Sequence, residues 1–215
     1  MNLNHANKTP APLEQLVYIV DDDEALRDSL IWLLESAGLK AQAFDSAETF
    51  LTAWSDSMSG CLVLDIRMPG MSGLELHERL NAMHSTLPVI FITGHGDVPM
   101  AVSALKKGAA DFIEKPFNDY DMINLIQNAL ITDRKRHDAR AQEADAQRRI
   151  EALTPREREV LELIVAGRLN KQIADDLGIS IKTVEVHRAR VMEKMGVHSL
   201  AELVQHVMIT SPKDE

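Results

Sequence analysis

Acidic side chains follow two short apolar segments in the first half of the chain. Three consecutive aspartates, residues 21–23, come directly after Leu16–Val20, and Asp65 comes directly after Cys61–Leu64. Carboxylates brought together from two segments repel one another unless a cation lies between them. Carboxylate, carbonyl and water oxygens are the ligands of Mg²⁺, which also binds phosphate oxygens. The pattern therefore indicates a divalent-cation site that handles a phosphoryl group.

A hydroxyl group and an ammonium group occupy equivalent places further along the chain. Thr93 ends the apolar segment that begins at Val89, and Lys115-Pro116 follows Phe112–Ile113. Ligands of an open α/β sheet bind at the carboxyl ends of its strands, so these groups are expected to point into one crevice with the carboxylates. A lysine and a hydroxyl beside a metal ion suit phosphoryl transfer, because they interact with the charged oxygens of the transferring group.

The strands that must position these groups are visible as apolar runs in the first 131 residues. Such runs, alternating with helical patterns, are typical of parallel strands buried on both faces. The predicted strands are Leu16–Val20, Ala41–Phe44, Cys61–Leu64, Val89–Ile92 and Phe112–Ile113, and the predicted helices cover residues 24–36, 46–55, 73–83, 98–107 and 119–131. This alternation predicts an α/β fold with a doubly wound, five-stranded parallel sheet of the flavodoxin-like kind.

Length and charge favour two small domains in the 215 residues. Residues 1–131 carry 8 Lys and Arg against 18 Asp and Glu, whereas residues 152–215 carry 9 against 10. The second half can therefore gather on one face the cations that nucleic-acid phosphates require.

Cys61 is the only cysteine, which excludes an intrachain disulfide, and is expected to be buried. No apolar run approaches the ~20 residues that span a bilayer, so we expect a soluble, cytoplasmic protein without membrane contact.

Four segments follow from these patterns: a disordered tail (1–14), the α/β domain (15–131), a charged linker (132–151) and an all-helical domain (152–215). Residues 133–151 hold 6 basic and 5 acidic residues without Gly or Pro. They predict a solvated helix that prolongs the helix before it. A dimerising coiled coil remains an alternative, although no sustained heptad of apolar residues is visible.

The last segment begins with a complete helix-start signature. Thr154 is placed at the N-cap, Pro155 at the first helical position, and Glu157 closes a capping box. Helices are predicted near residues 155–166, 170–177, 181–195 and 199–209, with Gly167, Gly178 and Gly196 at the breaks. Four short helices joined by glycine turns indicate a helix-turn-helix domain.

The helix over residues 181–195 has two distinct faces. Val184, Val191 and Met195 fall on the core side at 100° per residue, and the opposite face is mixed, with small residues at its centre. Such a face can enter the major groove of DNA. The expected contacts are Lys171, Lys182, Thr183, His187 and Arg190 with phosphates, and Glu185, Val186 and Ala189 with bases. Arg188 lies nearer the core side, so packing, an internal ion pair and a DNA contact all remain open as its role.

Residues 15–131 closely resemble the receiver domain of bacterial two-component response regulators. The matching segments are Ile19-Val20-Asp21-Asp22-Asp23, Leu64-Asp65-Ile66-Arg67-Met68-Pro69-Gly70-Met71-Ser72-Gly73, Ile92-Thr93-Gly94-His95-Gly96-Asp97 and Phe112-Ile113-Glu114-Lys115-Pro116. The resemblance implies that Asp65 accepts a phosphoryl group from a partner sensor histidine kinase. It also implies a cis Lys115–Pro116 bond. The implied roles are Mg²⁺ (or Mn²⁺) binding by Asp22, Asp65 and the Arg67 carbonyl, with Asp21 helping through water. Lys115 and Thr93 are implied to act in catalysis, and Thr93 and Phe112 in switching.

The last segment is similar to the LuxR-type helix-turn-helix. The similarity runs from Leu153-Thr154-Pro155-Arg156-Glu157 through Asn170-Lys171-Gln172-Ile173-Ala174 to Thr183-Val184-Glu185-Val186-His187-Arg188. With the receiver it gives the architecture of FixJ-like regulators, and the linker length resembles that of the StyR/TodT branch. These resemblances imply a protein that catalyses only its own phosphorylation and dephosphorylation. When phosphorylated it is expected to dimerise through the face built from residues 98–131. It is then expected to bind promoter DNA as an activator, with RNA polymerase as a partner. Glu185 departs from the basic residue many relatives carry, so base preference does not transfer.

Two other classes of protein remain as alternatives. A phosphatase that forms a phosphoaspartate needs a second catalytic Asp two residues after the nucleophile, where this chain has Arg67. A protein-binding adaptor would use the helical domain to contact a protein instead of DNA. Binding that weakens steeply with salt favours DNA over such a partner.

Overall fold

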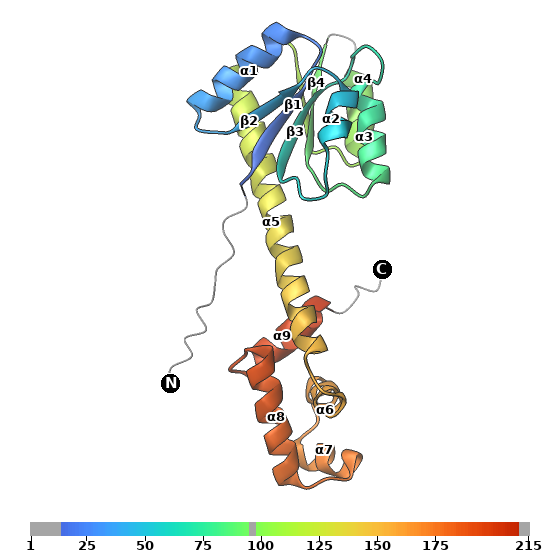
Figure 1. Ribbon diagram of the computed structural model, residues 1–215, viewed down its shortest axis with the longest axis vertical. Helices are drawn as coiled ribbons and strands as arrows, with labels where there is room; N and C mark the ends of the chain where they lie inside the picture. The colour runs from blue at the N-terminus through green and yellow to red at the C-terminus, as the bar shows by residue number, and fades with distance from the viewer. Residues whose placement is uncertain (1–13, 95–97, 211–215) are drawn as a thin grey trace. The chain divides into compact units, whose positions relative to one another are not determined.

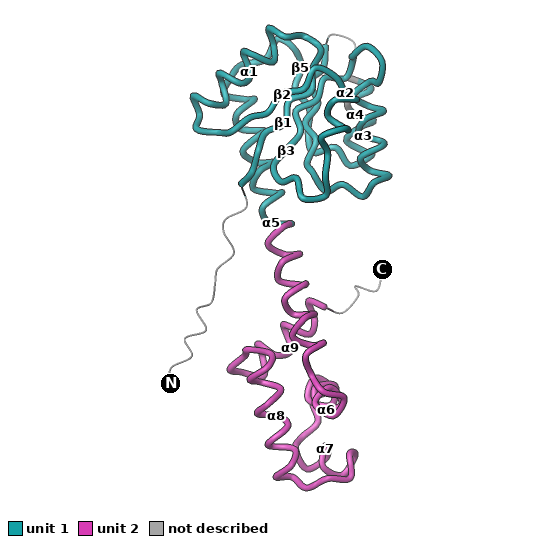
Figure 2. The backbone as a smooth tube through the Cα atoms, viewed as in Figure 1, with its two compact units in different colours: residues 1–136 teal, residues 137–215 magenta. Residues whose placement is uncertain are grey.

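The computed structural model describes residues 14–94 and 98–210. They belong to two compact units, residues 1–136 and 137–215 (Figure 2). The predicted N-terminal tail, residue 14 excepted, and the loop residues 95–97 lie outside the described residues. None of the helices in the described ranges combines the length and the apolar character needed to cross a membrane.

The first unit is a parallel five-stranded sheet with helices on both faces (Figure 1). Its strands are β1 (Leu16–Val20), β2 (Ala41–Phe44), β3 (Gly60–Asp65), β4 (Val89–Thr93) and β5 (Asp111–Glu114), and its helices are α1 (Glu24–Ser36), α2 (Ala47–Ala53), α3 (Gly73–Ala82), α4 (Val98–Lys106) and the first part of α5, which begins at Asp119. The strand order β2-β1-β3-β4-β5 confirms the predicted doubly wound sheet. The order reverses between β1 and β3, which places a ligand crevice at the carboxyl ends of those strands.

Two apolar layers hold the sheet, one on each face. In β3, Leu62 and Leu64 face the layer under α2, α3 and α4, whereas Cys61 and Val63 face the layer under α1 and α5. All six residues of β3 are buried, as expected for the central strand of a covered parallel sheet. Burial, and secondarily the nearby Asp133 carboxylate, raises the pKa of the Cys61 thiol to about 12.

Helix α5 runs without a break from Asp119 to Glu151, so the helix predicted over residues 119–131 continues through the linker, as predicted for residues 133–151. Its first part packs Met122, Ile126 and Ala129 against the sheet. The later part has no Gly or Pro to end it, and its side chains are mostly exposed. The helix therefore belongs to the first unit up to residue 136 and to the second unit beyond it.

Asp133 differs from the prediction of a solvated linker, because its side chain is fully buried. Its Oδ2 accepts hydrogen bonds from Gln15 Nε2 (2.9 Å), Ser59 Oγ (2.7 Å) and the Gly60 backbone N–H (2.8 Å). A buried carboxylate needs such donors to offset its lost hydration. Asp133 thus ties α5 to the amino ends of β1 and β3.

The second unit is all-helical, as predicted. Besides the end of α5 it contains α6 (Pro155–Val165), α7 (Asn170–Leu177), α8 (Ile181–Met195) and α9 (Leu200–Thr210) (Figure 1). Its core is formed by apolar residues from each of these helices, among them Val160, Ile164, Ile173, Val184, Val191, Met195 and Leu203. The predicted capping box is present, since Thr154 Oγ1 accepts from Glu157 N and Glu157 Oε2 accepts from Thr154 N.

Candidate functional site

A cluster of two carboxylates and one ammonium group lies at the carboxyl ends of β1, β3 and β5. Lys115 Nζ is 2.7 Å from Asp65 Oδ1 and 3.2 Å from Asp21 Oδ2. The Asp21 and Asp65 side chains are only 1% and 10% exposed, whereas that of Lys115 is 34% exposed. The lysine therefore bridges two buried carboxylates from the solvent side. The convergence expected at the strand ends is present for these three residues.

Backbone groups orient the second oxygen of each carboxylate. Asp65 Oδ2 accepts from the Arg67 N–H at 2.7 Å, and Asp21 Oδ1 accepts from the Asp23 N–H at 2.8 Å. Behind Asp65 the chain passes so closely that a Cβ on Gly73 would lie 2.1 Å from the Asp65 carbonyl oxygen. Only glycine can begin α3 at this position, and the close approach limits how far Asp65 can shift.

Burial dominates the electrostatics of this cluster. It raises the pKa of Asp21 above the ordinary value, even though the Asp23 N–H and the Lys115 charge act in the opposite direction. Burial alone would lower the pKa of Lys115, but its hydrogen bond to Asp65 and the two carboxylate charges raise it. Two carboxylates share one ammonium group here, so a bound cation would offset the remaining negative charge.

Replacing Asp21 by Asn is expected to stabilise the first unit at pH 7 by about 0.5–2 kcal/mol. Ionised Asp21 destabilises the folded state, because its pKa in the folded protein is above the ordinary value of 3.8. The contribution of Asp21 to the free energy of unfolding is therefore largest below pH 3.8, and it falls as the pH rises through the pKa of Asp21 in the folded protein. Urea unfolding at pH 7 measures the change. A variant no more stable than the parent protein would contradict this electrostatic assignment.

The donor set suits a hard divalent cation. Asp21 and Asp65 supply carboxylate oxygens, the exposed Asp22 is adjacent in sequence, and the backbone of Arg67 follows Asp65 by two residues. Within residues 14–94 and 98–210, no three His, Cys, Asp or Glu side chains form a ready cluster for a metal. Oxygen donors short of positive charge nevertheless match the preference of Mg²⁺, which keeps several waters and needs few protein ligands.

The two predicted switch residues lie on neighbouring strands. Thr93 is fully buried, and its hydroxyl makes a long hydrogen bond of 3.4 Å to the Ile113 carbonyl. Phe112 is partly buried and packs on the apolar layer below α4, opposite Phe91 in the strand register. The Lys115–Pro116 peptide bond is cis, as predicted.

The predicted DNA-contacting residues lie mainly on the exposed face of α8. Val184, Val191 and Met195 are buried as predicted, and Ser180 caps the helix. The exposed members of the predicted set are Lys171 on α7 and Lys182, Thr183, Glu185, Val186, Ala189 and Arg190 on α8. His187 and Arg188 are half-buried, and the Nδ1 atom of His187 is buried.

Sequence reasoning missed two side chains that hold the pocket in place. Arg27 Nη1 donates to the Asp21 carbonyl at 2.8 Å, and Glu48 Oε1 accepts from the Met71 N–H at 3.0 Å in the loop after Asp65. The signal for Arg27 was its position in the first turns of the helix that follows the acidic triplet. Nothing in the sequence linked Glu48 to a loop 23 residues away.

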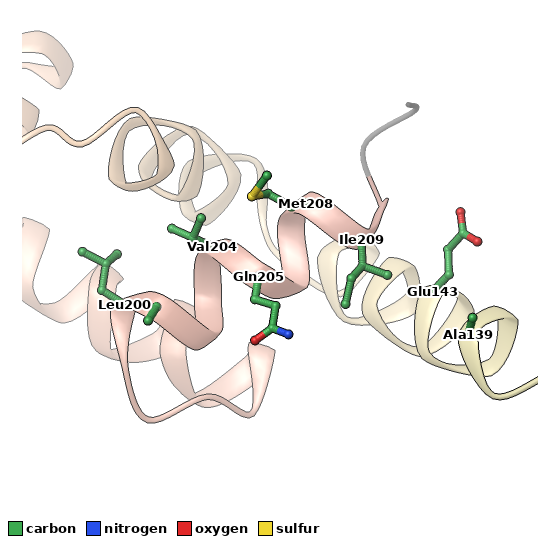
Figure 3. A pocket seen from close by; sticks show the side chains of 8 residues that line it. Ala139, Glu143, Leu200, Val204, Gln205, Met208 and Ile209 are labelled. Atoms are coloured by element: carbon green, nitrogen blue, oxygen red, sulfur yellow. The ribbon is translucent and has the colours of Figure 1, made fainter. Parts of the chain in front are cut away.

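An open apolar groove lies in the second unit between α9 and the later part of α5. Its volume is about 1000 Å³. Val204, Met208 and Ile209 of α9 and Ala139 and Glu143 of α5 line it (Figure 3). Among the described residues, Glu143 is the one ionisable side chain that lines it. The groove therefore lacks the paired groups that acid–base or phosphoryl chemistry requires.

Comparison with known proteins assigns each unit to a family. Residues 17–127 match the response regulator receiver domain, and residues 151–207 match the bacterial regulatory proteins of the luxR family. Together these matches cover the candidate pocket and the helices α6 to α8.

Individual relatives match this chain along most of its length. The chain is 48% identical to the transcriptional regulatory protein FixJ of Bradyrhizobium diazoefficiens over 89% of this chain and 94% of the relative. It is 43% identical to the response regulator protein TodT of Pseudomonas putida strain F1, over 88% and 84%. The solved structure of the response regulator StyR matches with a TM-score of 0.83 and 46% identity, covering 91% of this chain and 98% of that one.

Proposed function

Since this chain belongs to the bacterial two-component response regulators with a LuxR-type DNA-binding domain, we propose that phosphorylation of Asp65 controls DNA binding by α8. The protein is a transcriptional regulator and not a conventional enzyme. The observation that carries the proposal is the position of Asp65, which lies buried at the end of β3 and forms an ion pair with Lys115. The exposed mixed face of α8 supports the DNA-binding part.

Phosphorylation would proceed by attack of an Asp65 oxygen on the phosphorus of a phosphohistidine in the partner kinase. The new O–P bond forms as the N–P bond breaks, and the imidazole leaves. Lys115 is close enough to Asp65 to neutralise charge on the phosphoryl oxygens. Asp21, Asp22, Asp65 and the Arg67 carbonyl would hold Mg²⁺, which supplies further charge neutralisation when bound. Water later hydrolyses the acyl phosphate and restores the carboxylate.

The switch would start at the Thr93 hydroxyl. A phosphoryl group on Asp65 offers a stronger acceptor than the Ile113 carbonyl, to which Thr93 now makes only a 3.4 Å hydrogen bond. Turning the hydroxyl toward Asp65 would open space beside β5 for the Phe112 ring. Such a local charge change can shift a packed element between two arrangements.

Dimerisation is the proposed output of this shift. The face built from residues 98–131 exposes the apolar side chains Val102, Tyr120 and Ile131, which are 41%, 75% and 54% exposed. A dimer would present two α8 helices to inverted half-sites about one helical turn apart. We further propose a cytoplasmic location and activation of transcription with RNA polymerase.

The deciding experiment compares mass and DNA affinity with and without Mg²⁺ plus beryllium fluoride, a phosphoryl mimic. The probe is a duplex that the wild-type protein selects from a random-sequence library. We expect the mimic to double the mass in gel filtration and raise affinity at least tenfold, with binding that weakens steeply as salt rises. Unchanged mass and affinity would overturn the switch, and salt-insensitive binding would favour the adaptor alternative.

A further inference from the structure

The end of α8 that lies away from Ser180 is held by the last turn of α5. Arg149 Nη1 donates to the Met195 carbonyl, the last residue of α8, at 2.7 Å. The final carbonyls of a helix lack partners within the helix, and a positive charge near them is favourable. Arg149 therefore provides both a donor and a cation where α8 needs them.

The guanidinium of Arg149 makes two further contacts. Its Nε donates to Asp145 Oδ2 at 2.7 Å, one turn earlier on α5. Its Nη1 atom also lies over Gly196, where an added Cβ would be only 1.9 Å away. Gly196 has a φ of +65°, a conformation that favours glycine. The absence of a side chain at Gly196 therefore leaves room for the guanidinium of Arg149 against the backbone.

A second contact secures the same end of α8. Lys194 Nζ donates to Glu157 Oε2 at 2.6 Å and to the Ala152 carbonyl at 3.2 Å. Glu157 is only 3% exposed, and its hydrogen bond from Lys194, followed by that from Thr154, lowers its pKa to about 2. Lys194 thus joins α8 to the turn between α5 and α6.

We propose that Arg149 is a positioning residue for DNA recognition, because it sets the direction of α8 from the end opposite Ser180. The proposal rests on the proposed function, in which α8 reads DNA. With 15 residues, α8 is about 22 Å long, so a tilt of about 10° at one end moves the other by roughly 4 Å. Such a shift exceeds the tolerance of a hydrogen bond to a base edge.

It follows that the DNA-reading unit includes the last turn of α5. The boundary predicted at residue 152 leaves Arg149 outside, although this residue contacts the recognition helix directly. Bases are read only when several side chains meet their partners together, whereas phosphate attraction tolerates misalignment. Loss of Arg149 should therefore weaken binding to a selected site more than binding to unrelated DNA.

The test compares Arg149→Ala with Arg148→Ala in the full-length protein. Arg148 is a matched control, since it is the adjacent arginine, also pairs with Asp145 and is 74% exposed. Affinities are measured for the duplex selected by the wild-type protein and for a scrambled duplex of the same composition. We expect Arg149→Ala to lower the ratio of the two affinities at least tenfold, and Arg148→Ala to leave it within threefold. Equal ratios for the two variants would overturn the proposal.

Two further variants keep the result interpretable. Circular dichroism reports whether Arg149→Ala is folded; if it is not, Arg149→Lys decides, because one ammonium cannot hold Met195 and Asp145 in the same fork geometry. A lysine variant that is folded but at least threefold poorer in the ratio supports the proposal, and a wild-type ratio overturns it. Arg190→Ala tests whether α8 contacts DNA. If this variant leaves DNA affinity unchanged, the proposed function fails. If Arg190→Ala weakens binding but the Arg149 variants keep the wild-type affinity ratio, only the proposed role of Arg149 fails.

Discussion

Replacing Asp65 by Asn should abolish phosphoryl incorporation and remove the gain in DNA affinity that phosphorylation produces. The amide keeps the size of the side chain but is not a nucleophile for phosphorus, and it carries no charge for Lys115 to balance. Incorporation from a labelled acyl phosphate, measured with Mg²⁺ present, should fall by at least a hundredfold. DNA affinity measured after the same treatment should remain at the unphosphorylated level.

Asp56→Asn is the matched control, because Asp56 is an exposed carboxylate in the same unit. This variant should incorporate label at the rate of the parent protein. Persistent labelling of the Asp65→Asn protein would mean that another residue accepts the phosphoryl group. Loss of labelling with an unchanged gain in DNA affinity would separate the pocket from the DNA-binding unit.

Replacing Asp133 by Ala is expected to destabilise the first unit by about 2–5 kcal/mol. The change leaves the Ser59 hydroxyl and the Gly60 N–H buried without their acceptor, and each such group costs about 1–3 kcal/mol. Urea unfolding followed by tryptophan fluorescence measures this directly. Both tryptophans, Trp32 and Trp54, belong to the first unit.

Two comparison variants separate the role of this carboxylate from its position on α5. Asp133→Asn keeps one acceptor oxygen and should lose less stability than Asp133→Ala. Asp138→Ala changes an exposed carboxylate further along the helix and should have an effect within about 0.5 kcal/mol of zero. If Asp133→Ala were as mild as Asp138→Ala, the contacts with β1 and β3 would contribute little to stability.

Local patterns predicted the elements of this fold with small errors. The bounds of β1, β2, α1, α7 and α8 agree with the predictions residue for residue. Buried parallel strands need continuous apolar runs, and helix starts such as that at Thr154 need specific side chains within four residues. Asp21, Asp65 and Lys115 could be placed together because parallel strands align their carboxyl ends.

Contacts between residues distant in sequence were not predictable in the same way. Asp133 meets Ser59 across 74 positions, and Arg149 meets Met195 across 46. In the sequence each is one more charged residue in a polar helix, and the partner that either meets depends on how that helix packs. The direction of the Thr93 hydroxyl toward Ile113 likewise depends on the rotamer of a buried side chain, which no spacing reveals.

The burial of Cys61 makes this protein convenient for labelling. The thiol is fully buried with a pKa of about 12, so almost none of it is the reactive thiolate at neutral pH. A cysteine introduced on the exposed face of α8 or α5 would therefore take up a maleimide dye without removal of the native one. Slow labelling of Cys61 itself would then require the sheet to open, and its rate would report the opening of the first unit under native conditions.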